Sequence, residues 1–137
     1  MTQNKCPCGS NKEYLLCCAP YHQGEKAPTA EALLRARFSA YALNLPRFII
    51  ATTHPDNPAY QKNMQQWEQH ISQFSTTHHF EKVEILDITP GEEETTIRFI
   101  AHLKRGHYRA SFMETSRFVK QNGHWLYRSG VVAEHSS

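Results

Sequence analysis

The sequence has no cysteine after position 18, no run near the ~18 apolar residues that a membrane span needs, and little excess charge of either sign. Lys and Arg number 15 against 13 Asp and Glu, giving a net charge of +2. So weak a field disfavours a nucleic-acid binder that relies on bulk charge. The first ten residues lack the apolar region of a signal peptide, so we expect a cytoplasmic protein with no membrane span.

Also absent are the glycine-rich phosphate loops, the nucleophile elbow G-x-S-x-G and the metalloprotease motif H-E-x-x-H. The sequence therefore gives no motif for nucleotide binding or for these hydrolytic chemistries. A chain of 137 residues is long enough for one domain with a small appendage.

All four cysteines, Cys6, Cys8, Cys17 and Cys18, lie in the first 18 residues as C-x-C-x8-C-C. A disulfide framework would spread them along the chain, and a redox pair is more often C-x-x-C. Four thiolates from two short pairs suit a tetrahedral Zn²⁺ site, which we favour over a redox pair or idle thiols. A shell closed by four cysteines leaves no position for water, so this zinc would be structural, and His22 would not be a ligand.

Residues 6–18, Cys-Pro-Cys-Gly-Ser-Asn-Lys-Glu-Tyr-Leu-Leu-Cys-Cys, resemble the SEC-C zinc motif. That motif also forms the C-terminal tail of the preprotein translocase ATPase SecA, where it contacts partner proteins. Asn11 stands where the motif usually has glycine, and Asn is the least costly replacement if the backbone needs a positive φ. The resemblance implies a zinc knuckle that could dock a protein partner.

Residues 28–43, PTAEALLRARFSAYAL, resemble the start of the main domain of the YchJ-like family. Residues 53–55, 116–118 and 123–127 extend the resemblance to nearly the whole chain. The family is similar to NTF2-like folds and has no established activity. The resemblance implies a zinc knuckle over residues 1–20, a linker over 21–28 and an NTF2-like domain over 29–135.

The hydrophobic pattern predicts helices in the first half of this domain. A helix over 29–45 would be capped by Thr29, and Pro46 would stop it or start a short second helix. Asn57 would cap a further helix that continues to about residue 75.

After residue 75 the apolar period changes to two, which predicts about four strands, with Gln121-Asn122-Gly123 as the clearest hairpin turn. Helices followed by a meander of strands indicate an α+β fold. Together with the resemblance, this predicts an NTF2-like (cystatin-like) cone, in which the helices pack on a curved antiparallel sheet.

Such a cone can hold a pocket, and Glu114 is the best inward-facing polar candidate because strand alternation puts it on the same face as Phe112 and Phe118. A carboxylate among aromatic side chains could act as an acid or a base. The interpretation we favour is that Glu114 pairs with a neighbouring arginine, such as Arg98 or Arg117, or with a helix N-terminus, and so holds the structure together.

The other pocket candidates are His54, Tyr41 and Arg117. His54 precedes a proline at the expected mouth of the cone, where a loop hydrogen bond is the plainer interpretation than catalysis. Arg35 and Arg37 flank the apolar face of the first helix; they could bind an anion, but solvated helix charges are the simpler interpretation.

Two functions remain open. The first, slightly favoured, is a binding or adaptor module that docks a protein through the zinc knuckle. The second is an NTF2-like enzyme or small-molecule binder that uses the cone pocket, with the zinc only structural. We do not expect nucleic acid as a partner, because acidic residues dilute the basic ones around the knuckle.

Overall fold

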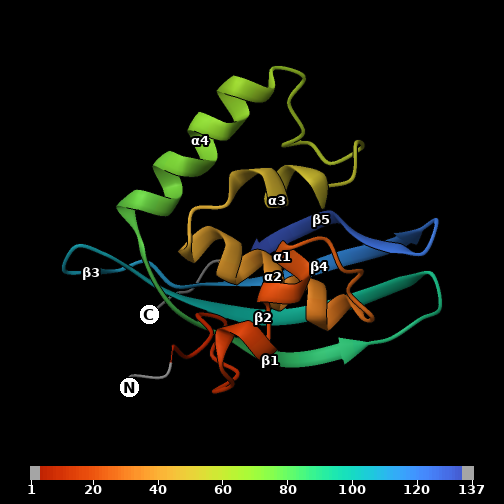
Figure 1. The fold of residues 1–137 in the computed structure, drawn as a ribbon, viewed down its shortest axis with the longest axis horizontal. Helices are drawn as coiled ribbons and strands as arrows, with labels where there is room; N and C mark the ends of the chain where they lie inside the picture. Colours follow the sequence, from red (N-terminus) through yellow and green to blue (C-terminus); the bar gives the residue numbers. More distant parts are fainter. Residues whose placement is uncertain (1–3, 134–137) are drawn as a thin grey trace.

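The sheet forms the body of the molecule in the computed structural model, which describes residues 4–133. Its strands are β1 His79–Thr89, β2 Glu94–Arg105, β3 Tyr108–Arg109, β4 Phe112–Gln121 and β5 His124–Ala133. They pair antiparallel in the order β1-β2-β4-β5, and the two-residue β3 pairs with β2 (Figure 1). The expected meander of four long strands is confirmed, with β3 as a short addition.

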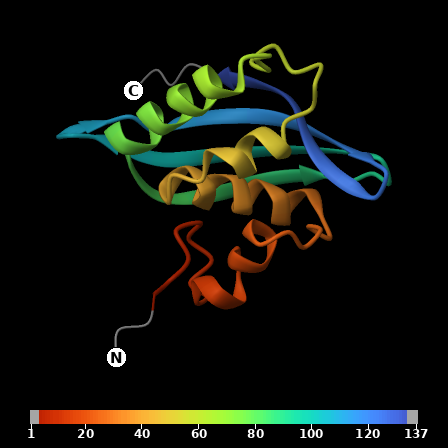
Figure 2. The same ribbon diagram turned by 45° about the horizontal axis from the view of Figure 1, so that its top comes forward.

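The helices lie on one face of this curved sheet (Figure 1). They are the 3₁₀ helix η1 Tyr14–Leu16, α1 Ala19–His22, α2 Ala30–Ala42, α3 Pro46–Ala51 and α4 Met64–Thr77. In Figure 2 the N-terminal segment lies beneath α2, at the opposite side of the molecule from α4. The α+β, NTF2-like architecture is therefore as predicted. The outermost residues of the expected units, 1–3 and 134–135, lie outside the described residues.

The start of α2 is set by Thr29, whose hydroxyl accepts a hydrogen bond from the Ala32 amide at 3.1 Å. Leu34 and Phe38 are buried one turn apart on the face that meets the sheet. Pro46 occupies the first turn of α3, where its missing N–H costs nothing. Both helix starts thus lie where the sequence places them.

The third helix begins later than the sequence predicts. Asn63, and not Asn57, caps α4, and its side chain accepts from the Gln66 amide at 3.1 Å. The Asn57 side chain is buried instead, where it accepts from the Ala59 amide at 2.8 Å and donates to the Arg128 carbonyl at 3.1 Å. Its hydrogen-bonding groups fix a loop against β5, and so they do not start a helix.

The alternation of apolar and polar residues is regular in β2 and irregular in β1, and the strand pairing explains the difference. In β2 the inward residues Ile97, Phe99, Ala101 and Leu103 are all buried. In β1 the pairing shifts between Phe80 and Lys82 and again between Ile85 and Asp87, which breaks the alternation. The β4–β5 turn has positive φ at Asn122 and Gly123, as a two-residue type I′ hairpin requires.

No helix in residues 4–133 is both long enough and apolar enough to cross a membrane.

Candidate functional site

The four cysteines converge on one point. Their Sγ atoms all lie within 4.8 Å of one another. Cys8 and Cys17 are 3.7 Å apart, and Cys17 and Cys18 are 3.9 Å apart, measured between sulfurs. Four sulfurs placed tetrahedrally at about 2.3 Å from one ion would be roughly 3.8 Å apart. The cluster therefore has the donor set and the spacing of a closed tetrahedral metal site.

The turn between the cysteine pairs depends on two residues with positive φ. Gly9 has φ 88° and Asn11 has φ 70°, which confirms the reason given for asparagine at this position. The Cys6 amide donates to the Lys12 carbonyl at 2.8 Å and closes the turn. This reversal brings the first pair of thiols back to the second.

The surroundings of the cluster favour a deprotonated sulfur at Cys8, whereas hydrogen bonds from Cys6 and Cys8, together with burial, raise the pKa of Cys18. Arg35 places Nη1 3.9 Å from the Cys8 Sγ and 3.5 Å from the Cys8 carbonyl oxygen. Ser10 lies with its hydroxyl 3.1 Å from the Cys17 sulfur. Hydrogen bonds from Cys18 and Cys6 hold the pKa of the Cys8 thiol well below its usual range. Arg35 is therefore not a simple solvated charge, since it faces the cysteine cluster.

The cysteine segment packs against the body of the protein. The Val83 amide of β1 donates to the Cys8 carbonyl at 3.1 Å. His22 is not part of the cysteine cluster. Its Nε2 donates to the Ala36 carbonyl at 2.8 Å, and its Nδ1 accepts from the Tyr14 hydroxyl at 2.6 Å. Burial lowers the pKa of His22 and so favours its neutral form.

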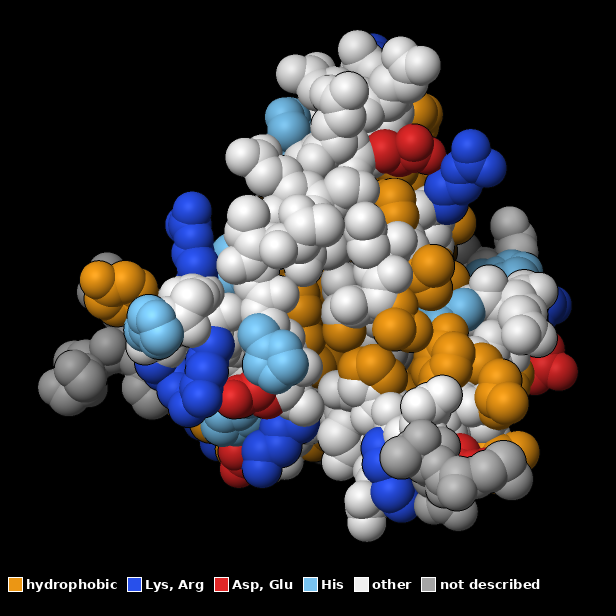
Figure 3. Space-filling view, turned by 60° about the vertical axis from the view of Figure 1, so that its left-hand side comes forward, with side chains coloured by type: hydrophobic (Ala, Val, Ile, Leu, Met, Phe, Trp, Pro, Cys, Tyr) orange, Lys and Arg blue, Asp and Glu red, His pale blue; other side chains and the backbone are white. Residues whose placement is uncertain are grey.

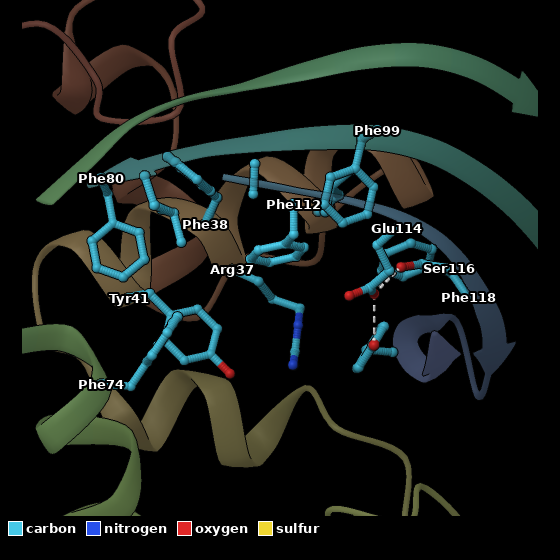
Figure 4. Close-up of a pocket in the computed structure, with 14 residues that line it drawn as sticks. Arg37, Phe38, Tyr41, Phe74, Phe80, Phe99, Phe112, Glu114, Ser116 and Phe118 are labelled. Atoms are coloured by element: carbon cyan, nitrogen blue, oxygen red, sulfur yellow. Dashed lines mark hydrogen bonds between the residues drawn. The ribbon is translucent and has the colours of Figure 1, made fainter. Parts of the chain in front are cut away.

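A second feature is a cavity of about 160 Å³ between α2, α4 and the sheet. Most of its wall is aromatic (Figure 4). The phenylalanines are Phe38, Phe74, Phe80, Phe99, Phe112 and Phe118. Figure 3 shows hydrophobic side chains gathered in the middle of one face of the molecule, below the mostly polar surface of α4.

The polar end of the cavity is built around Glu114 on β4. One carboxylate oxygen, Oε2, accepts hydrogen bonds from the Tyr127 hydroxyl at 2.7 Å and from the Ser116 hydroxyl. Burial, with the negative charge of Glu114, raises the pKa of Tyr127 above its usual range, so the phenol stays a donor. Within residues 4–133 the other oxygen, Oε1, accepts no hydrogen bond from the protein.

Arg37 enters the same cavity from α2. Its side chain is buried, and Nη1 donates to the Ile49 carbonyl at 3.1 Å and to the hydroxyls of Thr52 and Thr53 at 2.7 and 3.1 Å. Figure 4 shows the guanidinium reaching between Tyr41 and Glu114. Burial lowers the pKa of Arg37, but an arginine remains charged. In the described part of the chain Nε and Nη2 form no hydrogen bond.

The structure brings together two of the four pocket candidates. Glu114 and Tyr41 line the cavity. Arg117 does not, because it is exposed on the other face of β4 and pairs with Glu94 at 2.7 Å. The predicted partners of Glu114 were thus wrong, since its hydrogen bonds come from two hydroxyls.

His54 does not line the cavity either. It is a buried loop residue whose Nδ1 accepts from the Asp56 amide at 3.0 Å and whose Nε2 lies 2.9 Å from the side-chain amide of Gln121. The loop hydrogen bond expected at this position is confirmed.

Three polar residues that line the cavity were not among the pocket candidates: Arg37, Ser116 and Tyr127. The prediction that Arg37 is a solvated helix charge was wrong. Its spacing gave a signal, because Arg37 is three residues after Leu34 and four before Tyr41 and so shares their helix face.

The fold and the cysteine cluster define an NTF2-like domain preceded by a compact segment able to hold a metal ion. Residues 29–130 match the family model described as "YchJ, middle NTF2-like domain", and the chain belongs to this YchJ-like family. A UPF0225 protein from Chromobacterium violaceum is 35% identical over 133 residues, which cover 93% of each chain.

Two solved structures are similar over the cysteine segment as well as the main domain. A SEC-C motif containing protein from Rhodopseudomonas palustris has a TM-score of 0.80 and 29% identity, with 95% of this chain and 99% of that chain covered. Another, from Psychrobacter arcticus, has a TM-score of 0.74 and 26% identity, with 97% and 85% covered. The N-terminal cysteine cluster therefore fits a SEC-C knuckle.

Proposed function

We propose that this protein binds a small molecule in the cavity, and that the cysteine cluster holds a structural Zn²⁺ ion. One observation carries the proposal of small-molecule binding: Arg37 and Glu114 line the same aromatic cavity. Within residues 4–133 they do not form an ion pair with each other. Buried charges are costly unless they are paired or hydrogen-bonded, so the buried Arg37 and the half-buried Glu114, each with unused hydrogen-bonding atoms, support a binding site here.

Binding has more support than acid–base catalysis. Glu114 is the one carboxylate among the described residues that line the cavity, and no histidine lines it. Efficient general acid–base chemistry needs a positioned proton acceptor or donor beside the reacting group, and a second titrating partner is absent from this wall. The two tyrosines do not supply one, because burial raises the pKa of Tyr41 and Tyr127.

The test of the cavity is to fill it. Phe112→Trp adds bulk to a half-buried wall residue, whereas Val131→Trp adds comparable or greater bulk at an exposed position of β5. We expect one-ring aromatic compounds to perturb the amide NMR signals around Glu114 and Tyr127 in the wild type and in Val131→Trp, but not in Phe112→Trp. Absence of any perturbation at millimolar probe, or equal binding by both variants, would refute the cavity as a binding site.

The zinc proposal is supported by the S₄ donor set and the sulfur spacing. When bound, the ion would fix the two cysteine pairs, and the chain would hold it through Cys6, Cys8, Cys17 and Cys18. Elemental analysis of untagged protein should give one Zn²⁺ per chain, and Cys17→Ser should lower that content sharply. Retained full occupancy in Cys17→Ser, or no divalent metal in the wild type, would count against the proposal. Zinc binding needs reduced cysteines, and cysteines stay reduced in the cytoplasm. The zinc proposal therefore includes a cytoplasmic location.

An adaptor role for the knuckle is the second candidate, and exposed leucines favour it. Leu15 and Leu16 are 70% and 77% exposed on η1, directly before Cys17. If this segment docks a protein, Leu16→Ser should abolish capture of that partner, while Leu43→Ser, at an exposed leucine after α2, should not. Equal capture by the two variants would remove the adaptor candidate.

A further inference from the structure

Two charged residues of the cavity, Arg37 and Glu114, have unused hydrogen-bonding atoms that are complementary. Nε and Nη2 of Arg37 are donors, and Oε1 of Glu114 is an acceptor; none of the three is used by the protein within residues 4–133. Figure 4 shows Arg37 and Glu114 extending toward the same space from opposite walls, α2 and β4. A ligand that satisfies both must present an acceptor to Arg37 and a donor to Glu114.

The charge balance of the cavity selects against ions. Arg37 carries +1 and Glu114 −1, so the two together are neutral. A carboxylate ligand would be attracted by Arg37 but repelled by Glu114 at close range. A cationic ligand would be attracted by Glu114 but repelled by Arg37. A neutral ligand that carries both an acceptor and a donor gains from both residues and is repelled by neither.

The size and wall of the cavity define the rest of the ligand. An engineered protein cavity of about 150 Å³ holds one benzene molecule, and this cavity measures about 160 Å³. The phenylalanine side chains Phe38, Phe99 and Phe118 are buried in its deep wall and offer aromatic faces and edges to a flat ring. The space thus suits a single ring with a small polar substituent.

We infer that the cavity binds a neutral, single-ring aromatic compound with an amide-type group, a carboxamide or a cyclic lactam, whose carbonyl accepts from Arg37 and whose N–H donates to Glu114. The inference rests on the proposed function and adds to it the chemical class of the ligand. The Tyr127 and Ser116 hydroxyls hold Oε2 of the same carboxylate and leave Oε1 to the ligand.

Four probes of one shape and different polarity test the inference: benzamide, benzoate, benzamidinium and toluene. By NMR titration of the whole protein we expect benzamide to bind roughly tenfold or more tightly than either ion, because each ion faces one repelling charge. Tighter binding of benzoate, benzamidinium or toluene would overturn the ligand class while leaving the cavity as a binding site. If none of the four binds, the proposed function itself fails.

Glu114→Gln removes the repelling carboxylate and should shift the ratio of benzoate to benzamide affinity toward benzoate by about tenfold. Glu94→Gln is the matched control, because it removes the same charge from the exposed pair with Arg117 and should leave that ratio unchanged. An unchanged ratio in folded Glu114→Gln, checked by its amide NMR spectrum, would contradict the role of Glu114. If that variant does not fold, the order of the four probes in the wild type still decides the inference.

Discussion

Arg37 lies against the face of the Tyr127 ring, with its guanidinium carbon 4.6 Å from the ring centroid. This contact joins α2 to β5, while Nη1 of the same guanidinium holds the end of α3 through the Ile49 carbonyl. One buried arginine therefore connects three elements and also presents its remaining donors to the cavity. A residue in this position contributes to stability as well as to binding.

Replacing Arg37 should destabilise the protein markedly. In Arg37→Met the Ile49 carbonyl and the hydroxyls of Thr52 and Thr53 lose a charged donor, and we expect the free energy of unfolding to fall by about 2–3 kcal/mol. Arg47→Met is the control, because that arginine is exposed and its pair with Glu68 contributes little. Urea denaturation measures both, and a similar small change in the two variants would contradict the structural role of Arg37.

The buried Tyr127 phenol should make stability fall at alkaline pH. Its pKa in the folded protein is raised by burial and by Glu114, whereas in the unfolded chain it is about 10. Above pH about 10 the unfolded chain loses a proton that the folded chain keeps, so the free energy of unfolding decreases as the pH rises. Tyr127→Phe should show a shallower decrease between pH 9 and 11 in urea denaturation. Identical slopes would show that this phenol is not responsible.

Gly9 should tolerate no side chain, for two separable reasons. A Cβ at this position would lie 2.5 Å from the Cβ of Lys82, and the residue has φ 88°. Gly24 also has a positive φ, 116°, but a Cβ there meets open space. Gly9→Ala should therefore lower stability by about 1 kcal/mol or more beyond the loss in Gly24→Ala, measured by thermal unfolding. Equal losses would mean that the cysteine segment adjusts to the added methyl group.

The burial of His22 should make the protein less stable in acid, because a protonated ring can no longer accept from the Tyr14 hydroxyl. Burial holds the pKa of His22 below the ~6.5 of an unfolded histidine, so the unfolded chain binds a proton first as the pH falls. The stability that the neutral ring contributes is present above pH ~6.5 and is lost below it. Between pH 7 and 5 the wild type should lose more stability than His22→Gln, while His70→Gln, at an exposed histidine, should follow the wild type. If His22→Gln follows it too, this histidine does not carry the pH dependence.

The sequence predicted the features that local chemistry decides. Four predicted features depend only on neighbours in the chain, and the structure confirms each of them. They are the cluster of the closely spaced cysteines, the cap at Thr29, the helix start at Pro46 and the turn at Asn122-Gly123.

The errors fall where distant contacts decide. Asn57 has the side chain of a helix cap, but its buried donor is used by the Arg128 carbonyl, far along the chain. Arg37 has the charge of a surface residue, and only the meeting of α2 with Tyr127 and the end of α3 makes it internal. The partners of Glu114 likewise depend on how β5 pairs with β4.

Each outer strand of the sheet is hydrogen-bonded by another segment of the chain at one place along its free edge. The main chain of Cys8 accepts from Val83 in the middle of β1, and Thr52 and His54 exchange main-chain hydrogen bonds with Tyr127 on β5. Unpaired strand borders are templates for intermolecular pairing. The cysteine segment and the loop after α3 thus each occupy part of a free strand edge, and we expect loss of the cysteine segment to expose more of β1 to pairing with another chain.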